Sequence, residues 1–161
     1  MPLNAEQRTL LAHPAGWIAT GFGSGLSPIA PGTAGSLLAL LPWLALRELP
    51  LSYYAATIAM AFALGIWACG WVVRTLQVSD PGAAVWDEFV GQWIALVPLL
   101  FWPRGGLWII GGFILFRIFD IWKPWPVSWA DRRIGGGLGV MLDDTIAGAY
   151  AALVLALLLR L

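Results

Sequence analysis

Long apolar stretches, separated by short polar or glycine- and proline-containing connections, occupy most of the chain. Five such runs can be read, at residues 34–46, 51–73, 89–102, 107–119 and 140–159. At about 1.5 Å per helical residue, the second and fifth can cross a hydrocarbon layer of about 30 Å, whereas the other three reach about 20 Å. The pattern predicts about five hydrophobic helices, some of them short.

The connections between these runs indicate how the helices follow one another. Residues 47–50 and 103–106 form tight turns, so consecutive helices there should be antiparallel hairpins. Residues 21–35 are rich in Gly, Pro and Ser, and we expect them to form an irregular loop that enters the first run. Near the start, Asn4 and Gln7 have the spacing of a capping box, which predicts a short amphipathic helix on the membrane surface.

Composition indicates a membrane protein. Of the 161 residues, 60% are hydrophobic and only 11% are charged, against about 25% charged in ordinary soluble domains. The mean hydropathy is +0.79, and the eleven tryptophans suit the headgroup zone of a bilayer. We therefore expect one all-α domain over residues 1–161, a polytopic membrane helical bundle. The net charge is zero and no basic stripe is present, so a nucleic-acid partner is not expected.

The basic residues predict which way the bundle faces. Five crossings would place the N-terminus and the connections 74–86 and 117–139 on one side, together with Arg8, Arg74, Arg117, Lys123, Arg132 and Arg133. The other side would hold Arg47, Arg104 and Arg160. Because positive residues concentrate on the cytoplasmic side, the first side is predicted to be cytoplasmic.

Five carboxylates fall at the same cytoplasmic boundary, although each stands next to an apolar run: Asp87, Glu88, Asp120, Asp143 and Asp144. An ionised carboxylate near hydrocarbon is unfavourable by several kcal/mol unless it is paired or binds a metal. Small residues follow at helical spacing, Gly91 after Asp87 and Gly148 after Asp144, which lets helices approach there. Adjacent residues diverge by about 100° on a helix, so Asp87 and Glu88 should not face one point equally.

We therefore interpret these five carboxylates as catalytic candidates. Oxygen ligands suit a hard cation, and Mg²⁺ binds one or two carboxylates together with substrate phosphate oxygens. The candidate metal ligands are Asp87, Glu88, Asp120 and Asp144. Two alternatives stay open: the acidic residues are stabilised simply by helix N-termini, or Asp120 pairs with Arg117 and Lys123, three residues before and after it.

Residue types that are scarce limit the chemistry further. His13 is the single histidine, and it lies in the N-terminal segment, so a mechanism with several histidines is excluded. Cys69 is followed by Arg74 without a preceding histidine, which does not match a thiol-phosphatase loop, and no Asp-x-Asp pair is present. Metal-assisted hydrolysis of a phosphate ester is the chemistry that remains.

Hydroxyl and basic side chains supply candidate phosphate-binding groups. The glycine-rich loop offers Ser24, Ser27 and Thr33 just before a helix, where backbone N–H groups bind anions. Arg117, Lys123 and Arg132 lie in or beside a tryptophan-rich segment that is typical of headgroup depth. The loop could instead merely turn the chain, and the cations could instead attract anionic lipids.

Four segments resemble the phosphatidylglycerophosphatase A family: GFGSGLSPIAPGTAGS, VWDEFVGQWIAL, FRIFDIWKPWPVSW and GGLGVMLDDTIAG. They occur in this order, and the similarity extends from about Trp17 to Ala151. The resemblance implies a Mg²⁺-dependent lipid phosphatase of the bacterial inner membrane. Such an enzyme converts phosphatidylglycerophosphate to phosphatidylglycerol at the cytoplasmic leaflet. We expect this lipid substrate and the surrounding membrane lipids as partners, and no obligatory protein partner is evident from the sequence.

Two further classes of protein also carry acidic residues at such positions. A transport protein could use intramembrane carboxylates as an ion or proton relay, but it would place them near mid-membrane rather than at one edge. A lipid-binding scaffold would use the acidic pairs only as helix caps. Mg²⁺-dependent release of phosphate from a lipid separates an enzyme from both.

Overall fold

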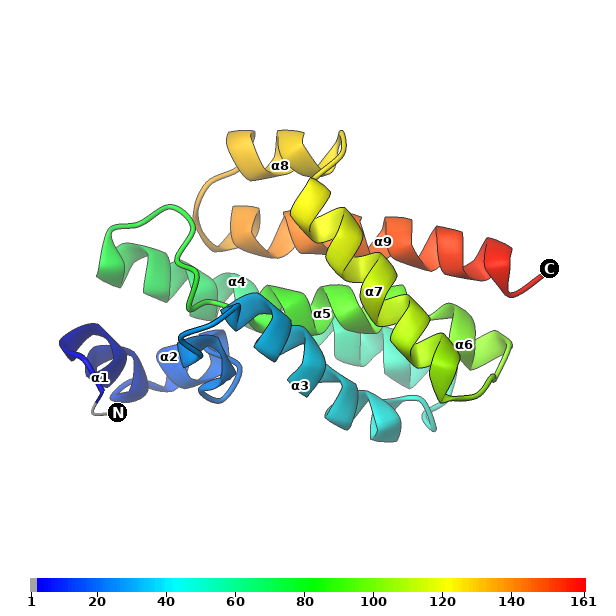
Figure 1. Cartoon of the computed structure of the whole chain (residues 1–161). Coiled ribbons are helices and arrows are strands. Elements are labelled where there is room, and N and C mark those ends of the chain that lie inside the picture. The colour runs from blue at the N-terminus through cyan, green and yellow to red at the C-terminus, as the bar shows by residue number, and fades with distance from the viewer. Residues whose placement is uncertain (1–2) are drawn as a thin grey trace.

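The structure is a computed structural model that describes residues 3–161, and within that range it is helical without strands (Figure 1). The α-helices are α1 (Ala5–Leu11), α2 (Pro14–Ala19), α3 (Pro31–Leu46), α4 (Leu51–Leu76), α5 (Trp86–Ala95), α6 (Pro98–Phe101), α7 (Gly106–Trp122), α8 (Val127–Arg133) and α9 (Gly136–Leu158). A short 3₁₀-helix, η1, covers Ser24–Leu26.

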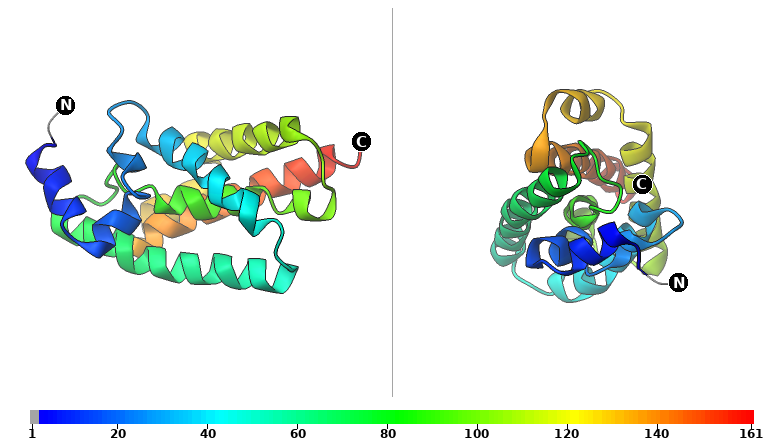
Figure 2. Two further views of the ribbon diagram at one scale, coloured as in Figure 1. Left: turned by 90° about the horizontal axis from the view of Figure 1, so that it is seen from below. Right: turned by 90° about the vertical axis from the view of Figure 1, so that its left-hand side faces the viewer.

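The longer helices run roughly along one axis, so the molecule has two ends. Helices α1, α2 and α8 and the connection 77–85 lie at one end (Figure 1). The turn between α3 and α4, helix α6 and the C-terminus lie at the other (Figure 2). The start of α5, the end of α7 and the start of α9 therefore meet at the first end.

The predicted apolar runs correspond to helices, with three corrections. The run 89–102 is split into α5 and α6, because Pro98 has no N–H to donate to the carbonyl of Ile94. The loop 21–35 is shorter than predicted, since η1 interrupts it and α3 begins at Pro31, where proline suits the first helical position. Helices α2 and α8 were not predicted.

The predicted N-terminal helix is present as α1, and its capping box is confirmed. The Asn4 side chain accepts from the Gln7 N–H at 2.7 Å, and the Asn4 N–H donates to the Gln7 side chain at 3.1 Å. These two bonds satisfy backbone donors that the first helical turn would otherwise leave free.

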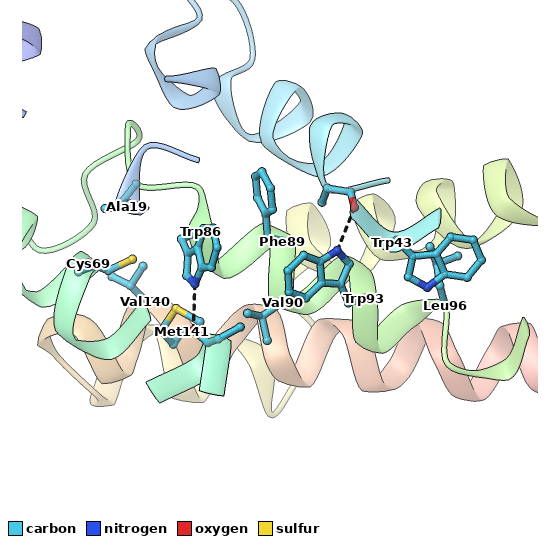
Figure 3. Close-up of a cluster of buried hydrophobic side chains, with 14 of the residues drawn as sticks. Ala19, Trp43, Cys69, Trp86, Phe89, Val90, Trp93, Leu96, Val140 and Met141 are labelled. Atoms are coloured by element: carbon cyan, nitrogen blue, oxygen red, sulfur yellow. Dashed lines mark hydrogen bonds between the residues drawn. The ribbon is translucent and has the colours of Figure 1, made fainter. Parts of the chain in front are cut away.

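Helix α5 lies at the centre of the bundle, packed by α3, α4, α7 and α9 (Figure 2). Nearly all of its residues are buried. Two of its indoles bind backbone carbonyls of neighbouring helices, Trp86 Nε1 donating to Ala61 and Trp93 Nε1 donating to Ala39, both at 2.9 Å (Figure 3). These bonds satisfy polar groups that would be unfavourable in an apolar core, and they fix α5 against α4 and α3.

Glycines allow α5 and α9 to approach closely, as the small-residue spacing predicted. A Cβ added at Gly148 would collide with the backbone carbonyl of Gly91. One added at Gly91 would lie 2.6 Å from the Phe116 ring and 2.7 Å from the carbonyl oxygen of Asp144. Backbone atoms cannot yield as a flexible side chain can, so only glycine fits at this crossing.

The outer surface is apolar, as expected of a protein in a bilayer. Large apolar side chains are exposed on the outward faces of α3, α4, α7 and α9, for example Leu41, Met60, Ile110 and Leu157. Helices α4 and α9 are long and apolar enough to cross a membrane. The prediction of about five hydrophobic helices is not confirmed, because α3, α5 and α7 are too short to meet that length.

The glycine crossing makes a prediction about stability. Gly148→Ala should lower the free energy of unfolding by about 1–3 kcal/mol, because the added methyl group forces α5 and α9 apart. Thermal unfolding in detergent would measure this. The matched control is Gly111→Ala on α7, where an added Cβ meets no atom within 4 Å. Equal stability of the two variants would contradict close packing at Gly148.

Candidate active site

A cavity of about 250 Å³ opens at the end of the bundle where α5 begins. Its walls come from the start of α3, the connection between α4 and α5, and helices α5, α7 and α9. The lining residues are Ala30, Pro31, Gly32, Asp80, Gly82, Asp87, Glu88, Arg117, Asp120, Lys123, Asp143 and Asp144. Carboxylates and cations therefore dominate the site.

All five carboxylates predicted from the sequence line this one cavity, together with Arg117 and Lys123. Asp87 and Glu88 both line it, but they face different parts of it, because adjacent residues diverge by about 100° on a helix. The first turn of α5 projects into the cavity, so neighbouring side chains reach different walls of the same space. Asp87 lies near the aspartates of α9, and Glu88 reaches Arg117 on α7.

Stabilisation by helix N-termini explains only part of this arrangement. Asp87 and Glu88 do lie in the first turn of α5, where the helix dipole favours a negative charge. Asp143 and Asp144, however, come about two turns after α9 begins at Gly136. Asp120 lies near the C-terminal end of α7, where the dipole disfavours an acid. Helix capping therefore does not account for three of the carboxylates.

Three aspartates form the most compact group. Asp87, Asp143 and Asp144 each offer a carboxylate oxygen, and these oxygens lie within 4.8 Å of one another. Each residue also has a buried carboxylate oxygen without a hydrogen-bond partner in the described structure. Buried acceptors are normally paired, and a hard cation is the partner that oxygen donors suit best. The residues present therefore fit a divalent metal ion.

The other two carboxylates, those of Glu88 and Asp120, share Arg117. Its Nη1 lies 2.8 Å from Asp120 Oδ2 and 3.2 Å from Glu88 Oε2. The pairing of Arg117 with Asp120 predicted from their spacing is thus confirmed. Ser36 Oγ also donates to Glu88 Oε2, at 2.8 Å. Glu88 presses so closely on α3 that a Cβ at Gly32 would collide with its carboxylate.

Lys123 does not pair with Asp120 among the ion pairs of the described residues. Its ammonium lies 2.5 Å from Asp131 on α8 and 2.8 Å from Asp143 on α9. Lys123 has a left-handed backbone at the end of α7, which turns the chain away from the helix axis. Burial by itself would lower the pKa of Lys123, but the hydrogen bonds to Asp131 and Asp143 outweigh it and raise that pKa above the usual range.

Four of the proposed phosphate-binding residues lie outside the cavity lining. Ser24 Oγ donates to the carbonyl of Gly21 at 2.9 Å, and Ser27 Oγ donates to that of Ile29 at 2.8 Å. Thr33 is on α3 but is not among the lining residues. Arg132 lines a separate depression beside α8. In the described structure the hydroxyls of Ser24 and Ser27 thus stabilise the loop itself.

The sequence reasoning missed Asp80 and Asp131 as residues of the site. Asp80 lines the cavity from the connection between α4 and α5, and Asp131 holds Lys123. The signal that could have identified them is their position, since both fall in connections predicted to lie on the same side as the carboxylates.

Comparison with known proteins identifies the family. The model of the family described as Phosphatidylglycerophosphatase A matches residues 17–159. The chain belongs to the phosphatidylglycerophosphatase A family. It is 43% identical over 148 residues to the Phosphatidylglycerophosphatase A of Escherichia coli (strain K12), covering 92% of this chain and 85% of that protein.

Two further relatives are similar to this chain over most of their length. The Phosphatidylglycerophosphatase A of Haemophilus influenzae is 40% identical over 154 residues, covering 94% of this chain and 92% of the relative. A "Putative phosphatidylinositol-3-phosphatase" of Bacteroides thetaiotaomicron is 45% identical over 147 residues, covering 86% of this chain and 89% of the relative. No solved structure matches the chain significantly.

The Arg117 cluster makes a prediction about electrostatics. Arg117→Met should lower the free energy of unfolding by about 3 kcal/mol, because it leaves two largely buried carboxylates without their cation. Adding Glu88→Gln and Asp120→Asn to this variant should recover most of the lost free energy of unfolding. Thermal unfolding in detergent measures both, with the exposed Arg104→Met as the control. A triple variant as unstable as the single one would mean that packing, not charge, explains the effect.

Proposed function

We propose that this chain hydrolyses the terminal phosphomonoester of phosphatidylglycerophosphate, releasing inorganic phosphate and phosphatidylglycerol for glycerophospholipid synthesis. Family membership supports this reaction. The observation that carries it is the convergence of carboxylates from α5, α7 and α9, with Arg117 and Lys123, in one cavity. A phosphate dianion needs cations, and this cavity offers both basic side chains and oxygen ligands for a metal.

The metal is proposed to be Mg²⁺, held by Asp87, Asp143 and Asp144. This set differs from the one predicted from the sequence, because Glu88 and Asp120 share Arg117 whereas Asp143 joins the compact group. When bound, a metal of this kind neutralises phosphate charge and lowers the pKa of coordinated water. Glu88 and Asp120, held in place by Arg117, are the groups proposed to take up a proton from the attacking water.

The basic side chains are proposed to orient the phosphate. The Lys123 ammonium has three N–H donors, and Asp131 and Asp143 accept two of them. The third donor remains for a phosphate oxygen. Asp131 thus acts as a positioning residue that keeps the ammonium at the cavity wall.

The protein is proposed to lie in the bacterial inner membrane, with the cavity at the cytoplasmic face. Helices α4 and α9 are long and apolar enough to span, and the shorter α3, α5–α6 and α7 would complete a multi-pass bundle. Helix α1 would rest on the membrane surface. A relay for ions would need carboxylates near mid-membrane, and the location of the cavity at one end of the bundle does not favour it.

Activity of the purified protein is the direct test. In detergent with phosphatidylglycerophosphate, inorganic phosphate should be released, EDTA should abolish the release, and Mg²⁺ should restore it. Phosphatidylinositol 3-phosphate should be included as a second substrate, because one relative is named for it. Full activity in EDTA would overturn the metal proposal. If neither lipid releases phosphate, the proposed function is overturned.

Variants can separate the metal ligands from the remaining carboxylates. Asp144→Asn should weaken divalent-cation binding at least about 100-fold. Removing even a residue that only hydrogen-bonds to a metal ligand weakens metal binding by about 10–100-fold. Glu88→Gln should leave that binding intact while abolishing activity. Titration of Mn²⁺ followed by electron paramagnetic resonance measures binding. The exposed Glu48→Gln, in the turn between α3 and α4 at the opposite end, is the matched control. The reverse pattern for Asp144 and Glu88 would refute this division.

The proposed orientation predicts a labelling pattern in intact cells. Single cysteines at Ser79 and Ser128, both at the end with the cavity, should be protected from an impermeant thiol reagent, whereas one at Gly105 should react. The natural Cys69 is fully buried and can be replaced by alanine to remove its background. Labelling of Ser79 and Ser128 but not Gly105 would invert the orientation.

A further inference from the structure

An apolar groove runs along the outer face of α7. It is a shallow, open depression of about 400 Å³, lined by residues of α7 itself: Phe113, Ile114, Arg117, Ile118, Ile121 and Trp122. Several of these side chains are open to the surroundings, Ile114 at 49%, Ile118 at 48% and Ile121 at 71%. Apart from Arg117, every lining residue is apolar or aromatic, so the groove suits a hydrocarbon chain.

The groove and the carboxylate cavity share one wall, which is Arg117. Its side chain lines both, and its Nη1 reaches Glu88 and Asp120 inside the cavity. A molecule lying in the groove would therefore have its polar end beside Arg117 and the carboxylates. This continuity distinguishes the groove from the other apolar faces of the bundle.

The length and direction of the groove match one leaflet. From Phe113 to Trp122 the helix rises about 14 Å at about 1.5 Å per residue, close to half of a hydrocarbon layer about 30 Å thick. Trp122 closes α7 at the end of the bundle that carries the cavity (Figure 1). A lipid whose headgroup lies between Asp120 and Trp122, beside the Arg117 guanidinium, would thus have its acyl chain alongside the groove towards Phe113.

We propose that the α7 groove holds one acyl chain of the phospholipid substrate, so that the phosphorylated headgroup enters the cavity sideways from the bilayer, past Arg117. This inference rests on the proposed function. An acyl chain gains little by moving from lipid to an apolar groove, because both environments are hydrocarbon. The groove therefore acts by orientation: it fixes the headgroup at the carboxylates and raises the chance of a productive encounter.

Filling the groove provides the test. Ile118→Trp should lower kcat/KM for long-chain phosphatidylglycerophosphate by about tenfold, because it displaces a chain that orients the headgroup. A water-soluble short-chain analogue with the same headgroup should be hydrolysed at an unchanged rate. The matched control is Met60→Trp on the outer face of α4, which should affect neither substrate. An unchanged rate on the long-chain lipid, or an equal loss on both substrates, would overturn the proposal.

A second measurement uses the unaltered protein and so does not depend on the folding of a variant. Phosphatidylglycerophosphate with a photoreactive group in its acyl chain should crosslink mainly to residues 113–122. Phosphatidylglycerol with the same photoreactive chain should crosslink to the outer helices without this preference. If the two lipids crosslink to the same residues in the same proportions, α7 is surrounded by lipid in the same way as the other outer helices, which would contradict the proposal. If wild-type protein releases no phosphate from either chain length, the proposed function fails and not the groove alone.

Discussion

Uncompensated negative charge is the constraint on which the rest of this structure depends. Six carboxylates line the cavity, those of Asp80, Asp87, Glu88, Asp120, Asp143 and Asp144, against the two cations Arg117 and Lys123. Like charges gathered in a partly buried space repel one another, and desolvation adds to that cost. The bundle tolerates this arrangement through its pairing pattern, in which each cation is shared by two carboxylates. The buried carboxylate oxygens left without a hydrogen-bond partner among the described residues belong to the three aspartates suited to a metal ion.

The apolar part of the bundle holds these charges in place. Helix α5 carries Asp87 and Glu88 at its start, and its indoles bind the backbones of α3 and α4. The contact of Gly91 with Gly148 brings α5 and α9 together, and this closeness sets the spacing between Asp87 and the aspartates of α9. Packing of the apolar core therefore determines the distances between the carboxylates of the site.

Helix α7 lies between the charged cavity and an apolar part of the outer surface. Its inward residues Arg117 and Asp120 form part of the cavity, and its outward residues form an apolar groove. The relatives at 40–45% identity are named for phospholipids with a phosphorylated headgroup, with glycerol in two cases and inositol in the third. What these lipids share is a phosphomonoester on a polyol attached to acyl chains. The proposed site, a carboxylate cavity next to an apolar groove, would suit that shared chemistry.

Much of this could be predicted from the sequence because its signals are local. Apolar runs of helical length required helices, and carboxylates beside those runs required compensation. The positions of the connections placed all five carboxylates at one end. The family resemblance supplied the substrate, which no periodicity could. The capping box at Asn4 and the ion pair between Arg117 and Asp120 were predictable for the same reason, since each depends on residues only three apart.

Only the tertiary structure decided the carboxylate partners that come from separate helices. The pairing of Lys123 with Asp131 and Asp143, and of Glu88 with Ser36, joins separate helices, so no spacing along one helix encodes it. Asp80 lacks an apolar neighbourhood that would have marked it. The serines of the glycine-rich loop looked suited to an anion, yet Ser24 and Ser27 bind carbonyls of their own loop. The sequence by itself determined that charge would gather at one end of a helical bundle. The packing of α5 against α3, α7 and α9 decided how that charge is divided, because hydrogen bonds and ion pairs depend on distances that only the assembled helices set.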